Sequence, residues 1–282
     1  MSDRTEEKPL EHHGRILEAE IRTTATPEQV YEAWADPEKI AQWFVDRAEG
    51  TAEPGGTSTW FFDKFNFRIP YEVLHAEPGK RFAIRWNAPP GRSAGLHEVT
   101  ITKEGGLTVM RMIESGFREG AEWDEEYEGT ASGWHMALAV LKHYLEHYFG
   151  KPRSSFLAMK PAEYTFERLL PLHRTASGLQ KWLTTSGAFG EAGGRFQMQL
   201  KEGESVTGVV LAKGKRETAL SWEEIDGALE LKGFSMGPQK MICVRGCGWG
   251  LSAARTKEIE QQMERALERL SQALASASHA AP

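Results

Sequence analysis

The sequence contains one internal repeat. Four short segments of the first half recur in the same order in the second half: Gln42-Trp43-Phe44 with Lys181-Trp182-Leu183, Gly55-Gly56 with Gly193-Gly194, Gly79-Lys80-Arg81 with Gly214-Lys215-Arg216, and Ser115-Gly116-Phe117 with Cys247-Gly248-Trp249. The separation falls from 139 positions for the first pair to 132 for the last, as a few loop deletions would produce. The 282 residues suffice for two domains of ordinary size. The repeat therefore predicts two copies of one fold.

The first copy begins with a strand and two short helices. Residues 17–22 alternate between apolar and charged side chains, which is typical of a half-buried strand. Thr26-Pro27-Glu28-Gln29 provides a capping box with proline in the first helical turn. Asp36-Pro37 ends that helix and caps a second one. We therefore expect two helices in tandem directly after the first strand.

A meander of strands and a long helix complete this copy. Turn signals divide residues 48–115 into several antiparallel strands, and they stand at Pro54-Gly55-Gly56, Glu77-Pro78-Gly79, Pro89-Pro90-Gly91 and Gly105-Gly106. Residues 124–149 carry an apolar stripe at steps of three and four, which predicts a helix long enough to cross a small sheet. The second copy also ends in a predicted helix, residues 252–275.

Four segments of the first half resemble the START/SRPBCC superfamily, and within it the group named after the activator of the heat-shock-protein-90 ATPase. They are Ala25-Thr26-Pro27-Glu28-Gln29-Val30-Tyr31, Asp36-Pro37-Glu38-Lys39-Ile40-Ala41-Gln42-Trp43-Phe44, Glu114-Ser115-Gly116-Phe117, and Gly133-Trp134. The resemblance implies an α+β chain of two tandem helix-grip domains. In each, a curved antiparallel sheet wraps a long C-terminal helix and leaves a cavity between them. The second half matches mainly through the repeat and lacks a Thr-Pro helix start, so we interpret it as a degenerate copy.

These observations predict the division of the chain. Residues 14–150 form the first helix-grip domain and residues 153–276 the second, degenerate one. Residues 1–13 and 277–282 are expected to be disordered tails.

Charge and composition exclude several classes of function. The net charge is −6, and the basic residues are scattered among acidic ones, which does not favour a nucleic-acid partner. No secretory signal and no apolar run of about 20 residues are present, so we expect a cytoplasmic protein without membrane insertion. The two cysteines, and the His143 and His147 pair, lack the further ligands that a metal site requires. No cofactor motif is present, and we predict neither a metal nor a cofactor.

Large side chains must fill the space between a curved sheet and a crossing helix, or a ligand must fill it. The ligand-binding residues that we predict are Trp34, Trp43, Trp60, Phe62, Phe67, Tyr71, Phe82, Trp86, His97, Arg111, Trp134, Leu138 and Leu141. Polar side chains that could orient a ligand are Arg68, Arg85, His97, Arg111, Glu114 and His135. We assign no catalytic residue.

The leading hypothesis is a non-catalytic protein that binds a small hydrophobic or aromatic ligand. One alternative is an enzyme like the polyketide cyclases and aromatases, in which His97 or His135 moves a proton and Arg111 holds an enolate. Another is a co-chaperone-like activator of a chaperone ATPase. The family's eukaryotic co-chaperones carry a separate N-terminal domain that this chain lacks, and this weakens that alternative. The second copy is poorer in aromatic residues, so we expect its cavity to be smaller or closed and the copy to dock on the first one or on another subunit. A homodimer is a further possibility.

Overall fold

The first half of the chain forms a seven-stranded antiparallel sheet and three helices. The computed structural model describes residues 10–87, 94–237 and 239–276. The predicted turn at Pro89-Pro90-Gly91 and most of both predicted tails lie outside these ranges. The elements are β1 (Arg15–Thr23), α1 (Pro27–Ala35), α2 (Pro37–Ala41), β2 (Arg47–Gly50), β3 (Thr57–Phe62), β4 (Phe67–Glu77), β5 (Arg81–Trp86), β6 (Gly95–Glu104), β7 (Leu107–Phe117) and α3 (Asp124–His147). The strand order is β1-β7-β6-β5-β4-β3-β2.

The second half repeats this plan. Its elements are β8 (Arg153–Pro161), α4 (Phe166–Arg174), α5 (Ala176–Trp182), β9 (Thr184–Ala188), β10 (Arg195–Leu200), β11 (Ser205–Lys213), β12 (Glu217–Trp222), β13 (Gly227–Met236), β14 (Gln239–Trp249) and α6 (Ala253–Ser276). The strand order β8-β14-β13-β12-β11-β10-β9 matches that of the first sheet position by position. The chain is thus an α+β protein of two tandem helix-grip domains.

The helix starts follow from the caps that the sequence contains. Thr26 Oγ1 accepts a hydrogen bond from the Gln29 amide, and Gln29 Oε1 accepts one from the Thr26 amide, which completes the capping box. Asp36 Oδ1 accepts from the Glu38 and Lys39 amides and so begins α2. In the second copy, Thr175 Oγ1 caps α5 by accepting from the Gly178 amide.

The repeated segments make the same contacts in both copies. Trp43 Nε1 donates to the carbonyl of Ala33, ten residues earlier, and Trp182 Nε1 donates to the carbonyl of Leu172, also ten residues earlier. The glycine pairs behave alike, because the first of each donates to a valine carbonyl and the second accepts from the same valine. These valines are Val73 and Val210. Local hydrogen bonds therefore support the duplication that the sequence predicts.

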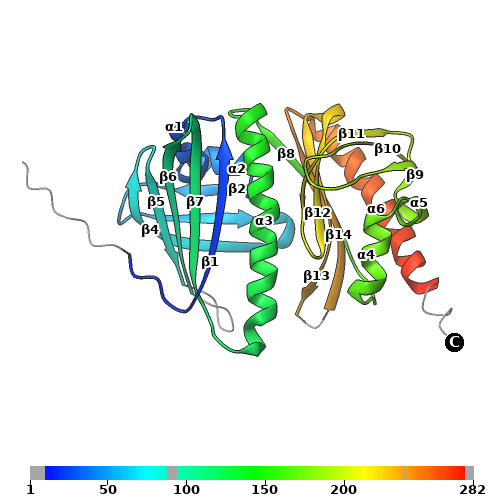
Figure 1. Cartoon of the computed structure of the whole chain (residues 1–282), viewed down its shortest axis with the longest axis horizontal. Coiled ribbons are helices and arrows are strands. Elements are labelled where there is room, and N and C mark those ends of the chain that lie inside the picture. The colour runs from blue at the N-terminus through cyan, green and yellow to red at the C-terminus, as the bar shows by residue number, and fades with distance from the viewer. Residues whose placement is uncertain (1–9, 88–93, 238, 277–282) are drawn as a thin grey trace, which may run out of the picture.

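Helix α3 lies between the two sheets (Figure 1). The first sheet wraps one side of α3, and strands β11 and β12 of the second sheet contact its other side. Helix α6 covers the opposite face of the second sheet through β8 and β14. The order of layers is therefore first sheet, α3, second sheet, α6, and the second domain docks on the first through a sheet face.

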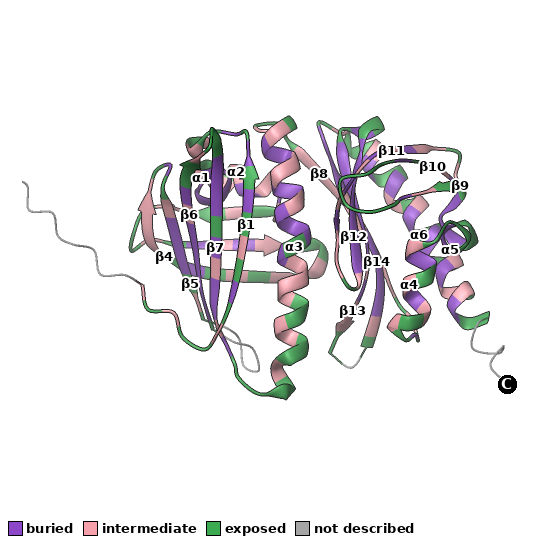
Figure 2. Ribbon diagram, in the orientation of Figure 1, coloured by how far each residue is buried: buried purple, intermediate pink, exposed green. Residues whose placement is uncertain are grey.

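Most of strands β12, β13 and β14 in the second sheet is buried on both faces, which explains the many small and apolar residues there. Every residue of β12 is buried, and Figure 2 shows the same colour along most of β14. On the face toward α3 the buried apolar side chains are mostly small, namely those of Ala212, Ala219, Ala228 and Cys247. The opposite face carries large ones, such as Leu220 and Trp222, in a separate core. Small residues let α3 approach the sheet closely.

Large side chains pack the interior of the second domain. Phe156, Trp182, Trp222, Leu220 and Leu270 are each at most 1% exposed. Both cysteines lie in β14 as buried free thiols. No helix within the described ranges is long and apolar enough to cross a membrane.

Residues 10–13 of the segment predicted as a tail lie against the first sheet. The ring nitrogens of His12 hydrogen bond with Ser115 Oγ and Glu98 Oε2, both at 2.9 Å. The carbonyl of His13 accepts from the Gly116 amide. Residues 1–9 lie outside the described ranges.

Candidate functional site

A cavity of about 320 Å³ opens between the first sheet, the first half of α3 and the second sheet. Strands β3 to β7, helix α3 and strands β13 and β14 all contribute side chains to its wall. Its volume falls within the range of about 300 to 1,000 Å³ that is usual for small-molecule sites. The cavity lies where a helix-grip fold is expected to hold a ligand.

Aromatic rings form most of the apolar wall. Five of the predicted ligand-binding residues line the cavity, namely Trp60, Phe62, Phe67, Trp86 and Trp134, together with Phe44 and Phe117, which we did not predict. Phe44 stacks on Trp134 with a distance of 5.0 Å between ring centroids. Gly95 lets the Trp86 ring lie directly on β6, because a Cβ atom at this position would come within 2.2 Å of that ring.

The other predicted apolar residues lie deeper and do not line the cavity. Trp34, Trp43, Tyr71, Phe82, Leu138 and Leu141 are each at most 5% exposed and belong to the core of the first domain. Trp34 packs edge-on against Trp43. Tyr71 packs against the lining residue Trp60 at a centroid distance of 5.0 Å. These side chains support the lining residues from behind.

His97 is enclosed behind the cavity wall. It is fully buried, with the rings of Trp34 and Trp134 at centroid distances of 4.9 and 5.0 Å. Neither ring nitrogen has a hydrogen-bond partner among the described residues. Its Nδ1 lies 3.8 Å from Oε2 of Glu114, its cross-strand neighbour. Glu114 itself lines the cavity and accepts a hydrogen bond from Trp134 Nε1, so Glu114 brings a carboxylate next to the aromatic part of the wall.

Arg111 lies on the outer face of the sheet, away from the cavity. It forms ion pairs with Glu20 at 2.9 Å and Glu104 at 2.8 Å. The buried Met110 and Met112 flank it in β7, and strand alternation sends Arg111 to the opposite side. The sequence pattern Met110-Arg111-Met112 already indicated that Arg111 faces away from the core. Among the other polar candidates, Arg68 lines the cavity, and Arg85 and His135 are exposed.

Two cationic side chains of the second domain complete the wall, and the sequence did not indicate them as site residues. They are Lys232 of β13 and Arg245 of β14. Lys232 Nζ lies 3.2 Å from Glu217 Oε2, and Arg245 Nη2 lies 2.8 Å from Glu230 Oε2, each pair joining cross-strand neighbours. Burial disfavours the charged form of Arg245, but the Glu230 carboxylate outweighs this and raises the pKa of the guanidinium. Arg245 is therefore charged where it meets the cavity.

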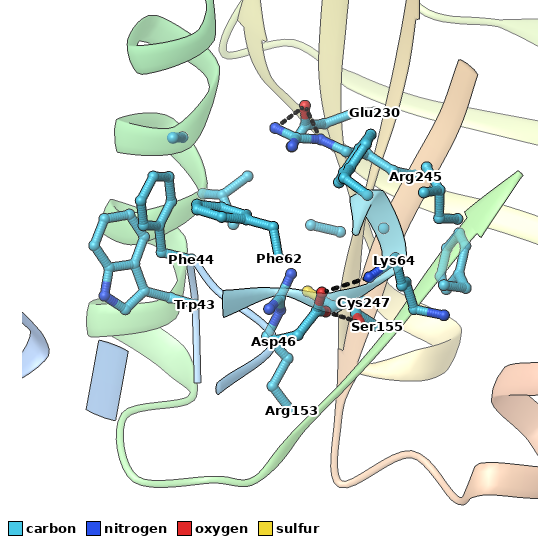
Figure 3. A pocket seen from close by; sticks show the side chains of 17 residues that line it. Trp43, Phe44, Asp46, Phe62, Lys64, Arg153, Ser155, Glu230, Arg245 and Cys247 are labelled. Carbon is cyan, nitrogen blue, oxygen red and sulfur yellow. Dashed lines mark hydrogen bonds and ion pairs between the residues drawn. The ribbon is translucent and has the colours of Figure 1, made fainter. Parts of the chain in front are cut away.

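A smaller pocket of about 60 Å³ continues along the contact between the domains. Figure 3 shows Phe44 and Phe62 of the first domain on one side, with Arg245 and Glu230 on the other. At its base, Asp46 accepts a hydrogen bond from Ser155 Oγ, and Arg153 donates to the Val45 carbonyl. Polar contacts thus fix the second sheet beside the larger cavity.

Comparisons with known proteins found one family and several solved structures to which the chain is similar. Residues 24–146 match the family described as Activator of Hsp90 ATPase homolog 1-like protein. No curated protein sequence matches the chain. Protein MLL2253 from Mesorhizobium loti is 24% identical and aligns over 46% of this chain and 96% of its own, with a TM-score of 0.43.

Two further solved structures are similar to one copy or to both. The Aha1 dimer from Colwellia psychrerythraea is 20% identical over 47% of this chain and 96% of that chain, with a TM-score of 0.42. The di-domain ARO/CYC BexL from the BE-7585A biosynthetic pathway is 15% identical over 94% of this chain and 95% of that chain, with a TM-score of 0.42. Residues 24–146 are thus similar to the Activator of Hsp90 ATPase homolog 1-like family, and the second half repeats the strand order of the first.

Proposed function

We propose that the protein binds a small hydrophobic or aromatic molecule in the cavity of the first domain. The observation that carries this proposal is a space of about 320 Å³ bounded by Trp60, Phe62, Phe67, Trp86 and Trp134. Burying an apolar ligand against these rings removes apolar surface from water, which favours binding. The few polar groups of the wall would then orient the ligand.

We propose binding without catalysis, because the side chains named for cyclase chemistry do not meet. His97 is sealed behind the wall, His135 is exposed on α3, and Arg111 lies on the outer face of the sheet. A general acid or base must come within hydrogen-bond reach of the substrate. The arrangement thus gives that mechanism no support.

The remaining sequence hypotheses stay predictions. The co-chaperone hypothesis is supported by the family match alone, and faster ATP hydrolysis by the chaperone on addition of this protein would establish it. The cytoplasmic location and the homodimer are likewise predictions from the sequence.

Gly133 offers a direct way to fill the cavity. It lines the cavity on α3, and a Cβ atom built there meets no atom within 4 Å. We expect Gly133→Leu to weaken binding of the apolar fluorescent probe N-phenylnaphthylamine at least about tenfold, because the leucine side chain occupies the ligand's space. A fluorescence titration of purified protein measures this.

Gly129 provides the matched control. It lies one turn earlier on α3, also has no atom within 4 Å of a built Cβ, and does not line the cavity. Both substitutions replace a helical glycine and should raise helix stability by about 0.5–1 kcal/mol. The Gly129→Leu protein should bind the probe as the wild type does. Equal affinity of all three proteins, or no binding to any of them, would refute the proposed function.

A further inference from the structure

Two of the three cationic side chains in the cavity wall come from the second domain. Lys232 and Arg245 project from neighbouring strands of the second sheet into the wall of a cavity whose aromatic part belongs to the first domain. The degenerate copy therefore completes the binding site of the other copy. Its role in binding would then be to recognise one end of the ligand.

Both cations keep hydrogen-bond donors that the ion pairs do not use. Arg245 donates through Nε and Nη2 to a single oxygen of Glu230, and a guanidinium has five N–H groups. Lys232 Nζ has one carboxylate partner among the described residues, Glu217, and an ammonium has three N–H groups. Glu217 is held in turn by Ser132 Oγ of α3. The carboxylates thus anchor the two cations and leave donors available for a ligand.

The first domain contributes three charged side chains to the wall, namely Glu114 of β7, Glu126 of α3 and Arg68 of β4. A carboxylate repels an anionic group of a ligand, whereas Lys232 and Arg245 attract one and can donate charge-assisted hydrogen bonds to it. Two of the three lining cations, Lys232 and Arg245, lie together on the neighbouring strands β13 and β14. This pair favours an acidic group of the ligand at β13 and β14, with an apolar body between Trp60, Phe67 and Trp134.

We propose that the ligand is an amphipathic aromatic acid, whose anionic oxygen group binds Lys232 and Arg245 of the second domain while its rings occupy the cavity of the first. This inference rests on the proposed function and adds the chemical class of the ligand. It assigns specificity for the acidic group to the degenerate copy.

Two fluorescent probes with one aromatic body test the inference. Anilinonaphthalene sulfonate carries a sulfonate that N-phenylnaphthylamine lacks. We expect Lys232→Gln to weaken binding of the sulfonate probe about tenfold, as loss of a charge-assisted hydrogen bond implies, and to leave binding of the neutral probe unchanged. The double variant Glu230→Gln, Arg245→Gln removes the second cation without leaving a buried charge unpaired, and the same selective loss is expected.

Lys160→Gln is the control for loss of one positive charge, because Lys160 pairs with Glu268 at the surface and does not line the cavity. It should bind both probes as the wild type does. Circular dichroism melting verifies that each variant is folded. The Lys232 variant and the Arg245 double variant test the inference independently of each other. If either folded variant changes the affinity for both probes equally, or for neither, the inference is wrong.

The outcomes also separate this inference from the proposed function. If the neutral probe binds the wild type and Gly133→Leu abolishes that binding, the cavity binds ligands whatever the cation variants show. If neither probe binds the wild-type protein, both proposals fall together.

Discussion

Replacing Trp249 by alanine is expected to lower the free energy of unfolding by about 3–5 kcal/mol, the usual cost of removing a buried tryptophan. Trp249 is the last residue of β14, yet its side chain belongs to the core of the first domain and is 2% exposed. It stacks on Tyr148 at a centroid distance of 4.5 Å, and its Nε1 donates to the Gln42 carbonyl at 2.7 Å. The side chain therefore joins the two domains.

The variant Trp249→Phe separates the contribution of ring packing from that of the hydrogen bond. Phenylalanine keeps an aromatic ring against Tyr148 and loses the hydrogen bond to Gln42, so we expect a smaller loss, of about 1–2 kcal/mol. Equilibrium urea unfolding followed by circular dichroism measures both variants. If Trp249→Ala unfolds at the urea concentration of the wild type, Trp249 does not stabilise the contact between the domains.

Acidification from pH 7 to pH 5 is expected to cost the second domain about 2 kcal/mol through His173 alone. This residue is 2% exposed, and its ring packs against Trp182 at a centroid distance of 5.6 Å. Burial, with a smaller contribution from Arg174, lowers the pKa of His173 to about 3. The unfolded chain, whose histidine has an ordinary pKa, binds a proton below about pH 6.5. Stability is therefore complete above that pH and falls as the pH falls toward 3.

His173→Phe isolates this contribution. Phenylalanine suits an apolar site beside Trp182, and the repeat places an aromatic residue, Trp34, at the corresponding position, 139 residues earlier. The variant should lose less stability than the wild type between pH 7 and pH 5, in urea unfolding at each pH. Parallel curves for the two proteins would show that His173 is not held neutral in the folded state.

The sequence predicted those features that depend on local or periodic signals. The capping box at Thr26 and Gln29 forms as expected, and the long helix predicted for residues 124–149 is α3, Asp124–His147. The repeat predicted two copies of one fold, and the two sheets have the same strand order. Trp43 and Trp182 also make corresponding hydrogen bonds. These features could be predicted because the residues that determine them lie close together in the sequence or recur at a regular spacing.

Which residues line the candidate site depends on which face of each sheet packs against which layer. The alternation of apolar and polar residues along a strand does not reveal this. His97 and Glu114 point inward together because they are cross-strand neighbours. His97 lies deeper and is enclosed, whereas Glu114 lines the cavity, and the sequence does not reveal this difference in depth. Lys232 and Arg245 belong to the cavity only because the second sheet packs on α3. The sequence of the second half by itself does not indicate that its sheet packs on α3.

The central claim is that, within the part of the chain that the structure describes, the proposed ligand cavity lies in the first copy, while the second copy is packed inside and serves as a wall. Native mass spectrometry of the wild-type protein with N-phenylnaphthylamine tests it most directly, because it counts bound molecules per chain. The structure predicts one probe molecule per chain, lost in the Gly133→Leu variant. Two probe molecules per chain, or none, would contradict this account.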